Sequence, residues 1–198
     1  MSESQLDESR PRKSLAYKQI VEWVVVVGVA LVVAVFLRVF LVQQYYIAGP
    51  SMETTMFSDN RVLVNKLAYR LGEIERGDVV VFDRALMNGS EVEHDDLIKR
   101  VVGLAGETIS IKDCVVLING EALPEPYLPK RDSILSELDE RCGVVEMSET
   151  KLAMDEVFLM GDNRPQSFDS RMFGAINQNL IIGQAFILIW PISSAKGL

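Results

Sequence analysis

The chain of 198 residues carries a net charge of −8 and contains one histidine and two cysteines. The acidic balance argues against a nucleic-acid-binding protein, because such proteins usually present a basic face. A histidine-dependent triad would have to use His94, and the sequence lacks the His/Cys cluster that a zinc site requires, so we expect neither metal nor cofactor.

The N-terminal part contains an apolar stretch, residues 20–42, that is interrupted only by Glu22 and Arg38. Roughly 20 apolar residues suffice to cross about 30 Å of hydrocarbon. A cleavable leader has a shorter apolar region that ends in small residues, whereas Tyr45 and Tyr46 follow here. We therefore predict a transmembrane anchor over residues 19–42, rather than a cleavable leader or a buried core helix.

The flanks of this stretch differ in charge. Four basic residues precede it: Arg10, Arg12, Lys13 and Lys18. Residues 39–60 contain no lysine or arginine. The positive-inside rule then predicts a single-pass protein of the cytoplasmic membrane, with residues 1–18 as a cytoplasmic tail and residues 43–198 outside.

After the anchor the pattern changes to short β-type runs. These are residues 79–82, 97–102, 107–111, 115–118, 157–160 and 181–189. Asn119-Gly120 is a strong hairpin-turn pair, and residues 60–71 are expected to hold a strand and one short turn. This spacing predicts a mainly β protein, with an antiparallel, partly barrel-like β-domain over residues 43–198.

Residues 121–155 differ from their surroundings, because prolines crowd their start and charges dominate afterwards. We interpret them as a surface excursion between strands. Cys142 lies within this segment and Cys114 near a turn before it. An oxidising compartment would permit a disulfide between them, but spacing alone leaves two free thiols as an alternative.

Ser51 follows Gly49-Pro50 directly after the anchor, in a turn context that could expose its hydroxyl. Alone this signal is weak, since most serines are exposed and chemically unremarkable.

Lys99 lies in a strand whose two faces are apolar apart from one cation each, Lys99 and Arg100. At least one of the two should be partly buried, unless the strand is an edge strand whose cation faces solvent. An arginine stays protonated when buried, whereas a lysine can lose its proton. To act as a base near pH 7, a lysine must lower its pKa by about 3 units, or roughly 4 kcal/mol, and apolar burial produces shifts of that size.

Residues 161–171 are dense in polar and turn residues. Asp169 and Arg171 would share a face in extended backbone and could pair. The alternative is a polar loop held by internal hydrogen bonds, which could also serve as the scaffold of a catalytic pair.

Three stretches together resemble the signature boxes of bacterial type I signal peptidases (leader peptidases), the Ser-Lys dyad proteases. They read GPSMETTM at residues 49–56, IKRVVGLAGE at 98–107 and GDNRPQSFDSR at 161–171. Their order, a basic N-terminus, an anchor directly before the first box and a Trp-Pro near the end all match. The resemblance implies a membrane-bound serine endopeptidase that removes signal peptides from exported preproteins.

The resemblance also implies roles for individual residues. Ser51 matches the nucleophile, Lys99 its general base and Ser167 a serine that hydrogen-bonds and orients the lysine. The residues expected to hold the loops of the site are Asp162, Asp169 and Arg171. Those expected to line the substrate pockets are Ile47, Ala48, Met56, Leu97 and Ile98. The implied partners are signal peptides and the lipid bilayer, without nucleic acid.

The sequence departs from the family pattern at three positions. Gly49 stands where some members carry a hydroxyl residue that completes the oxyanion hole, so the second donor would be a backbone group or water. Thr54 and Ala105 stand where proline is common, which removes no reacting group.

Two other interpretations stay open at this point. A non-enzymatic, membrane-anchored β-domain that binds exported proteins would tolerate loss of Ser51 and Lys99. A Ser-Lys self-cleaving regulator would share the dyad, although the anchor argues against it. His94 adjoins Asp95 and Asp96 in what reads as a polar loop, which favours a solvated surface role.

Overall fold

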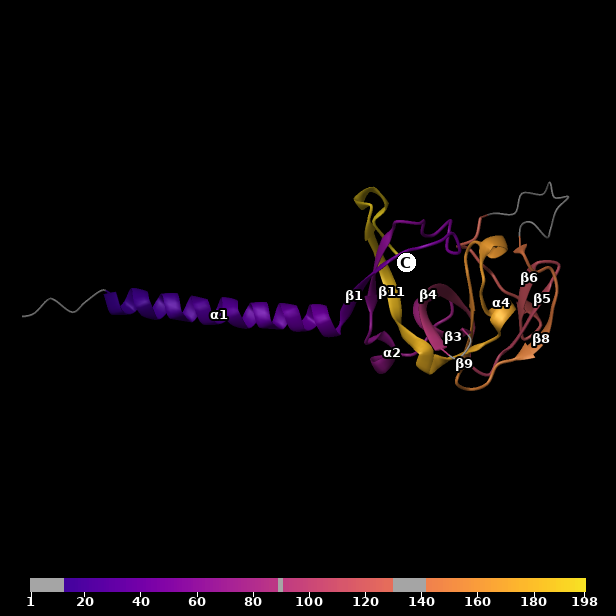
Figure 1. Cartoon of the computed structure of the whole chain (residues 1–198), viewed down its shortest axis with the longest axis horizontal. Coiled ribbons are helices and arrows are strands. Elements are labelled where there is room, and N and C mark those ends of the chain that lie inside the picture. Colours follow the sequence, from indigo (N-terminus) through magenta and orange to yellow (C-terminus); the bar gives the residue numbers. More distant parts are fainter. Residues whose placement is uncertain (1–12, 89–90, 130–141) are drawn as a thin grey trace, which may run out of the picture. The chain divides into compact units, whose positions relative to one another are not determined.

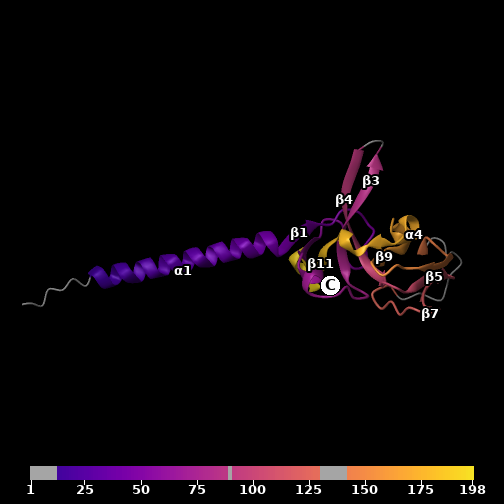
Figure 2. The ribbon, with the colours of Figure 1, turned by 90° about the horizontal axis from the view of Figure 1, so that it is seen from below.

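The computed structural model describes residues 13–88, 91–129 and 142–198. The chain divides between residues 41 and 42 into two compact units, a helical unit and a β unit. Figures 1 and 2 show the ribbon of both units.

The helical unit consists of α1 (Lys13–Phe40), which has 28 residues. At 1.5 Å per residue it is roughly 42 Å long, more than the thickness of a bilayer core. Its segment Tyr17–Val35 is long and apolar enough to cross a membrane, and none of that segment is buried against protein. A helix that is apolar all round and not covered by protein has the properties of a membrane-spanning segment. The first strand begins at Val42, the last residue of the range 19–42 that we predicted for the anchor.

The β unit is built on a large antiparallel sheet. Its strands, in order of hydrogen-bonded neighbours, are β1 (Val42–Tyr46), β2 (Arg61–Asn65), β11 (Ile181–Trp190), β3 (Val79–Asn88), β4 (Glu91–Gly103), β9 (Glu156–Met160) and β10 (Ile176–Asn177). A short strand, β12 (Lys196–Gly197), pairs with β11. The β3–β4 hairpin extends well beyond the rest of the unit in Figure 2. The prediction of a mainly β fold with antiparallel sheets is confirmed, although the described strands form no closed barrel.

A smaller antiparallel sheet follows in the chain. Its order is β7 (Glu121–Ala122), β6 (Val115–Ile118), β5 (Thr108–Lys112) and β8 (Met147–Lys151). Asn119 and Gly120 both have positive φ, of 52° and 85°, as a two-residue hairpin turn of the primed type requires.

The interpretation of residues 121–155 as a surface excursion was wrong for its two ends. Glu121–Ala122 and Met147–Lys151 are strands of the small sheet, and Leu152 is buried. We did not predict β8 because its sequence is mostly polar. All but one of its side chains are exposed, and only its backbone pairs with β5. Cys114 and Cys142 form a disulfide, and residues 130–141 lie outside the described part of the chain.

The core of the β unit consists of three apolar clusters. The first cluster packs β2, β3 and β11 against the segment before and after Ser51. The second cluster lies on the other face of β3 and β4. The third cluster joins the small sheet to β4 and β9. β4 therefore lies between β3 and β9 and contributes to the core on both faces. Short helical turns are α2 (Ala68–Leu71), η1 (Arg164–Gln166) and α4 (Ser170–Phe173), of which η1 lies within the polar segment 161–171 and α4 begins in it.

Candidate active site

Ser51 lies in a tight turn between β1 and β2. The Glu53 N–H donates to Pro50 O at 3.0 Å and the Met56 N–H to Met52 O at 2.9 Å, so the chain turns back on itself directly after Ser51. The Met52 and Met56 side chains are fully buried and fix the turn to the core, which leaves the Ser51 hydroxyl partly exposed. Thr54 has φ of 88°, a conformation that proline cannot adopt, so this turn differs from one with proline at that position.

Lys99 lies on β4 opposite Val80 of β3 and is 3% exposed. Its Nζ donates to Ser51 Oγ at 2.7 Å and to Ile98 O at 2.9 Å. The alternative of an edge strand with a solvated cation is wrong, because β4 is paired on both sides. A hydroxyl and an amine that are 48 residues apart in sequence are thus in hydrogen-bond contact.

The environment of Lys99 favours the neutral amine. Burial lowers the pKa of Lys99 from 10.5 to about 8, although the charges of Asp169 and Asp162 act to raise it. Neither carboxylate is within ion-pair distance of the Lys99 amine; each of them binds an arginine instead. A base with a pKa near 8 is neutral in about a tenth of molecules at pH 7, which is enough for proton transfer.

Arg100 lies on the opposite face of β4 and is also buried. Its Nε and one terminal nitrogen donate to the two carboxylate oxygens of Asp162 at 2.8 and 2.7 Å. The other terminal nitrogen donates to Gly77 O at 2.7 Å, and Thr55 Oγ1 donates to Asp162 Oδ2 at 2.5 Å. Asp162 therefore joins β4 to the Ser51 turn. We predicted that Asp162 holds the loops of the site, but we did not predict Arg100 and Thr55 as its partners.

Asp169 and Arg171 form an ion pair in which both side chains are almost fully buried. The local geometry differs from the one we expected: Asp169 itself is extended, but it is the N-cap of α4, and Arg171 lies in the first turn of that helix. Asp169 Oδ2 also accepts from the Gly161 N–H at 2.9 Å. Burial alone would raise the pKa of Asp169, but the hydrogen bonds and charge of Arg171 outweigh burial and lower it.

Ser167 was expected to hydrogen-bond Lys99, and the structure shows no such bond. The Ser167 Oγ is buried and acts on the Asp169 carboxylate, whose pKa it helps to lower, whereas the two acceptors of Lys99 are Ser51 and Ile98. The residue nevertheless adjoins the site, because a Cβ on Gly161 would collide with both the Ser167 side chain and the Ser51 carbonyl oxygen. Gly161 is thus the point where the 161–171 segment touches the nucleophile's turn.

Asn163 is a second contact that our sequence analysis did not assign. Its N–H donates to Ser51 O at 3.0 Å and its side-chain amide to Pro50 O at 3.0 Å. The sequence shows only that Asn163 follows Asp162 in a polar segment. No sequence pattern indicates that this segment contacts the Ser51 turn.

A cavity of about 90 Å³ adjoins Ser51 and Lys99. Four of the five predicted pocket residues line it: Ile47, Ala48, Leu97 and Ile98. Met56 does not line it and is fully buried in the core instead. Additional lining residues that we did not predict are Tyr45, Tyr46, Val81 and Asp96. Burial, together with Asp96, raises the pKa of Tyr45 to about 12, so its hydroxyl stays protonated.

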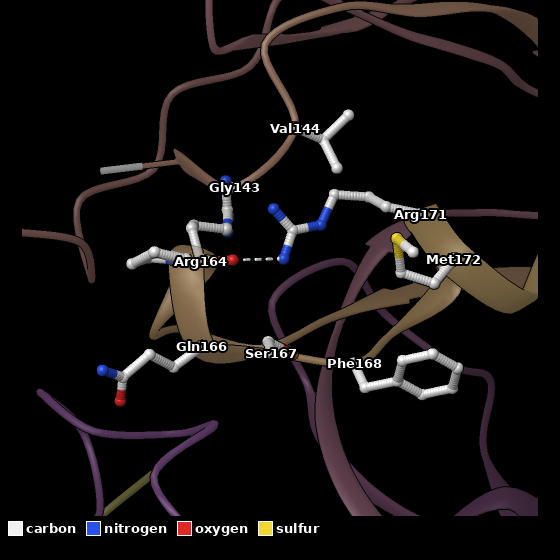
Figure 3. A pocket seen from close by; sticks show the side chains of 9 residues that line it. Gly143, Val144, Arg164, Gln166, Ser167, Phe168, Arg171 and Met172 are labelled. Atoms are coloured by element: carbon white, nitrogen blue, oxygen red, sulfur yellow. Dashed lines mark hydrogen bonds between the residues drawn. The ribbon is translucent and has the colours of Figure 1, made fainter. Parts of the chain in front are cut away.

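A second, larger cavity of about 300 Å³ is lined by residues of the 161–171 segment together with Gly143, Val144 and Met172 (Figure 3). Arg171 crosses its wall and donates to Arg164 O at 2.6 Å. Arg171 also donates to Cys142 O at 2.5 Å, which ties the disulfide to this segment.

His94 is outside the site. It lies in strand β4 rather than in the loop that we expected, is exposed, and contacts Asp83 on the neighbouring strand at 2.8 Å. In the described ranges, no three His, Cys, Asp or Glu side chains are grouped as a metal site would need.

Comparisons with known proteins identify the family of this chain. The profile of the family described as "Signal peptidase, peptidase S26" matches residues 20–190. Signal peptidase I P of Bacillus subtilis subsp. natto is 33% identical over 193 residues, which cover 96% of this chain and 97% of the relative. Signal peptidase I of Bacillus caldolyticus is 36% identical over 171 residues, 82% of this chain and 87% of the relative.

A crystal structure of a signal peptidase I from Enterococcus faecalis V583 is 30% identical, has a TM-score of 0.43, and covers 57% of this chain and 96% of that one. From the family profile and the relatives together, the chain belongs to the signal peptidase family, peptidase S26. It is accordingly a membrane-associated serine endopeptidase, and the apolar helix α1 fits that association.

Proposed function

We propose that this protein removes signal peptides from exported preproteins, with Ser51 as nucleophile and Lys99 as general base. The observation that carries the proposal is the 2.7 Å contact between Lys99 Nζ and Ser51 Oγ, at an amine whose pKa burial lowers to about 8. The family relatives named signal peptidase I support the choice of substrate class.

In the first half of the reaction, neutral Lys99 takes the proton from Ser51 Oγ as that oxygen attacks the scissile carbonyl carbon. The Ser51 N–H stabilises the developing oxyanion. Gly49 has no side chain to provide a second donor, so a backbone N–H or a water fills that role. The ammonium of Lys99 then returns the proton to the leaving amine, and an acyl-enzyme remains.

In the second half, Lys99 deprotonates a water that attacks the acyl-enzyme and releases the signal peptide. The cavity of about 90 Å³ beside the dyad is small, and its wall includes the apolar side chains of Ala48, Leu97 and Ile98, which suits a short side chain before the cleaved bond. Asp162, Asp169 and Arg171 support the site by holding the 161–171 segment against the Ser51 turn and β4.

We further propose that residues 1–18 lie in the cytoplasm, that residues 19–42 anchor the chain in a bacterial cytoplasmic membrane, and that residues 43–198 act outside. The four basic residues before the span and the absence of lysine and arginine over residues 39–60 support this orientation. A signal peptide in the same bilayer would then reach the site at a high effective concentration.

The test compares the full chain with Ser51→Ala and Lys99→Ala in detergent or lipid vesicles, using a preprotein whose shortening is followed on a gel. We expect both variants to lose cleavage and a serine-reactive probe to label only chains that keep Ser51. Cleavage that survives in Ser51→Ala would disprove the dyad. Binding of preprotein without cleavage by the unaltered chain would favour an anchored binding domain, and cleavage only of its own chain would favour a self-cleaving regulator.

A further inference from the structure

The short segment after β7 places an aromatic ring on one of the buried arginines. The Arg100 guanidinium carbon lies 4.2 Å from the centre of the Tyr127 ring, a distance typical of cation–π stacking. The Tyr127 hydroxyl donates to Glu125 Oε1 at 2.7 Å. The ring is therefore held in place by its own neighbour and is not free to swing away from Arg100.

Glu125 binds the second buried arginine. One terminal nitrogen of Arg164 donates to Glu125 Oε2 at 3.0 Å, and the other donates to Oε1. Both side chains are nearly buried, at 8% and 11% exposed. Arg164 Nε in turn donates to Gly161 O at 3.1 Å.

The two contacts converge on consecutive residues of the site. Arg164 holds the carbonyl of Gly161, and Arg100 holds the carboxylate of Asp162. The next N–H in the chain, that of Asn163, donates to the carbonyl of Ser51. Thus two residues of the 123–128 segment contact the two cations that fix the 161–163 backbone beside the nucleophile.

We propose that Glu125 and Tyr127 are positioning residues for catalysis, which act through Arg164 and Arg100 to keep the Asp162 pair dry and the Lys99 amine at Ser51. This inference rests on the proposed function. It assigns a catalytic consequence to a segment that contacts neither Ser51 nor Lys99.

The charges around Lys99 determine the sign of the expected effect. Asp162 and Asp169 face it from the 161–171 segment, and each is paired with an arginine, Arg100 or Arg171. From β3 its neighbour across the strand pair is the apolar Val80. Loss of the Tyr127 ring would admit water to the Arg100–Asp162 pair and loosen it. Better hydration and a less compensated Asp162 both favour the ammonium, so the pKa of Lys99 should rise.

The experiment measures kcat/KM of the full chain in detergent micelles against a fluorogenic signal-peptide substrate between pH 6 and pH 10. Tyr127→Leu removes the ring, and Tyr127→Phe keeps the ring but not the hydroxyl. The matched control is Glu107→Gln, because Glu107 also pairs with a partly buried arginine, but that partner, Arg76, bonds Val102 O and not the 161–171 segment.

We expect Tyr127→Leu to move the acid limb of the profile upward by about 0.5–1 pH unit, which lowers kcat/KM at pH 7 roughly 3- to 10-fold. Tyr127→Phe keeps the ring but loses the hydroxyl that holds it, so it should move the limb by less than Tyr127→Leu does, and Glu107→Gln should lower the melting temperature without moving the limb. If circular dichroism shows that Tyr127→Leu does not fold, Tyr127→Met is measured by the same criteria.

An unmoved acid limb in the folded Tyr127 variant, or an equal shift in Tyr127→Phe, overturns the positioning role. The proposed function is disproved by a different result, namely cleavage that survives in Ser51→Ala. If cleavage depends on Ser51 but the acid limb does not move, the proposed function stands and only the positioning role is disproved.

Discussion

Lys99 and Arg100 are consecutive cations on the two faces of β4. Both are buried, but only Arg100 is paired with a carboxylate. Arg100 is 6% exposed; it donates two hydrogen bonds to the Asp162 carboxylate and one to a carbonyl oxygen, and it stacks on an aromatic ring. Lys99 is 3% exposed and donates only to one hydroxyl and one carbonyl oxygen. One strand thus holds a permanent charge on one face and an amine that can lose its proton on the other.

The difference shows how a site can contain a base without adding a histidine. Burying a cation is costly unless an anion accompanies it, and an uncompensated lysine responds by lowering its pKa. The carboxylates nearest to Lys99 would remove that effect if they were unpaired. Because Arg100 and Arg171 bind these carboxylates, the two arginines keep the lysine reactive.

The largest effect on the cleavage rate is expected when Lys99 is replaced by arginine, a cation that keeps its proton. Lys99→Arg keeps charge and approximate size, but arginine does not deprotonate in this pH range. We expect the cleavage rate to fall roughly 10²- to 10⁴-fold at every pH from 6 to 10, in single-turnover assays. Lys112→Arg, at an exposed position on β5, is the control. A loss smaller than tenfold would mean that Lys99 is not the base.

The next effect concerns stability on the other face. Arg100→Met leaves Asp162 buried without its partner, which should cost about 3–5 kcal/mol of unfolding free energy. Urea denaturation followed by tryptophan fluorescence measures this loss, with Arg70→Met at an exposed position as control. Adding Asp162→Asn should recover part of the loss. Equal stability of Arg100→Met and the unaltered chain would mean that the ion pair contributes nothing net.

The smallest effect has the opposite sign. The folded pKa of Lys99 is about 8 against 10.5 in the unfolded chain, so below pH 8 the lysine is charged in both states and its burial opposes folding. Stability should therefore rise as pH increases from 8 to 10.5. We expect Lys99→Met to stabilise the protein at pH 7 by up to about 3 kcal/mol, and by little above pH 10.5. Melting temperatures across this range, with Lys112→Met as control, measure the gain; a gain independent of pH would exclude charge burial as its cause.

The sequence predicted one half of this comparison well. Alternation along residues 97–102 indicated one cation on each face, and the boxes around Ser51 and Lys99 indicated their partnership through a family resemblance. Local patterns alone could not have paired them, since Ser51 and Lys99 are 48 residues apart and two other strands lie between them.

The other half depended on tertiary contacts that leave no local pattern. Arg100 and Asp162 are 62 residues apart, and nothing in either segment indicates the other. Ser167 was assigned to Lys99 from the family resemblance, whereas in this structure Lys99 donates to Ser51 and Ile98, and Ser167 acts on Asp169. β8 was missed because its side chains are polar and exposed, although its backbone pairs with β5. In each case the outcome depends on where a group lies in the folded chain, and the residue type alone does not give that position.

The close approach at Gly161 has a consequence for engineering this enzyme. A library that randomises residues 161–171 would recover variants at many positions but only glycine at 161, since even a methyl group there meets the Ser51 carbonyl and the Ser167 side chain. Directed evolution of substrate preference should therefore hold that codon fixed and place its diversity on the cavity wall formed by Tyr45, Leu97 and Ile98.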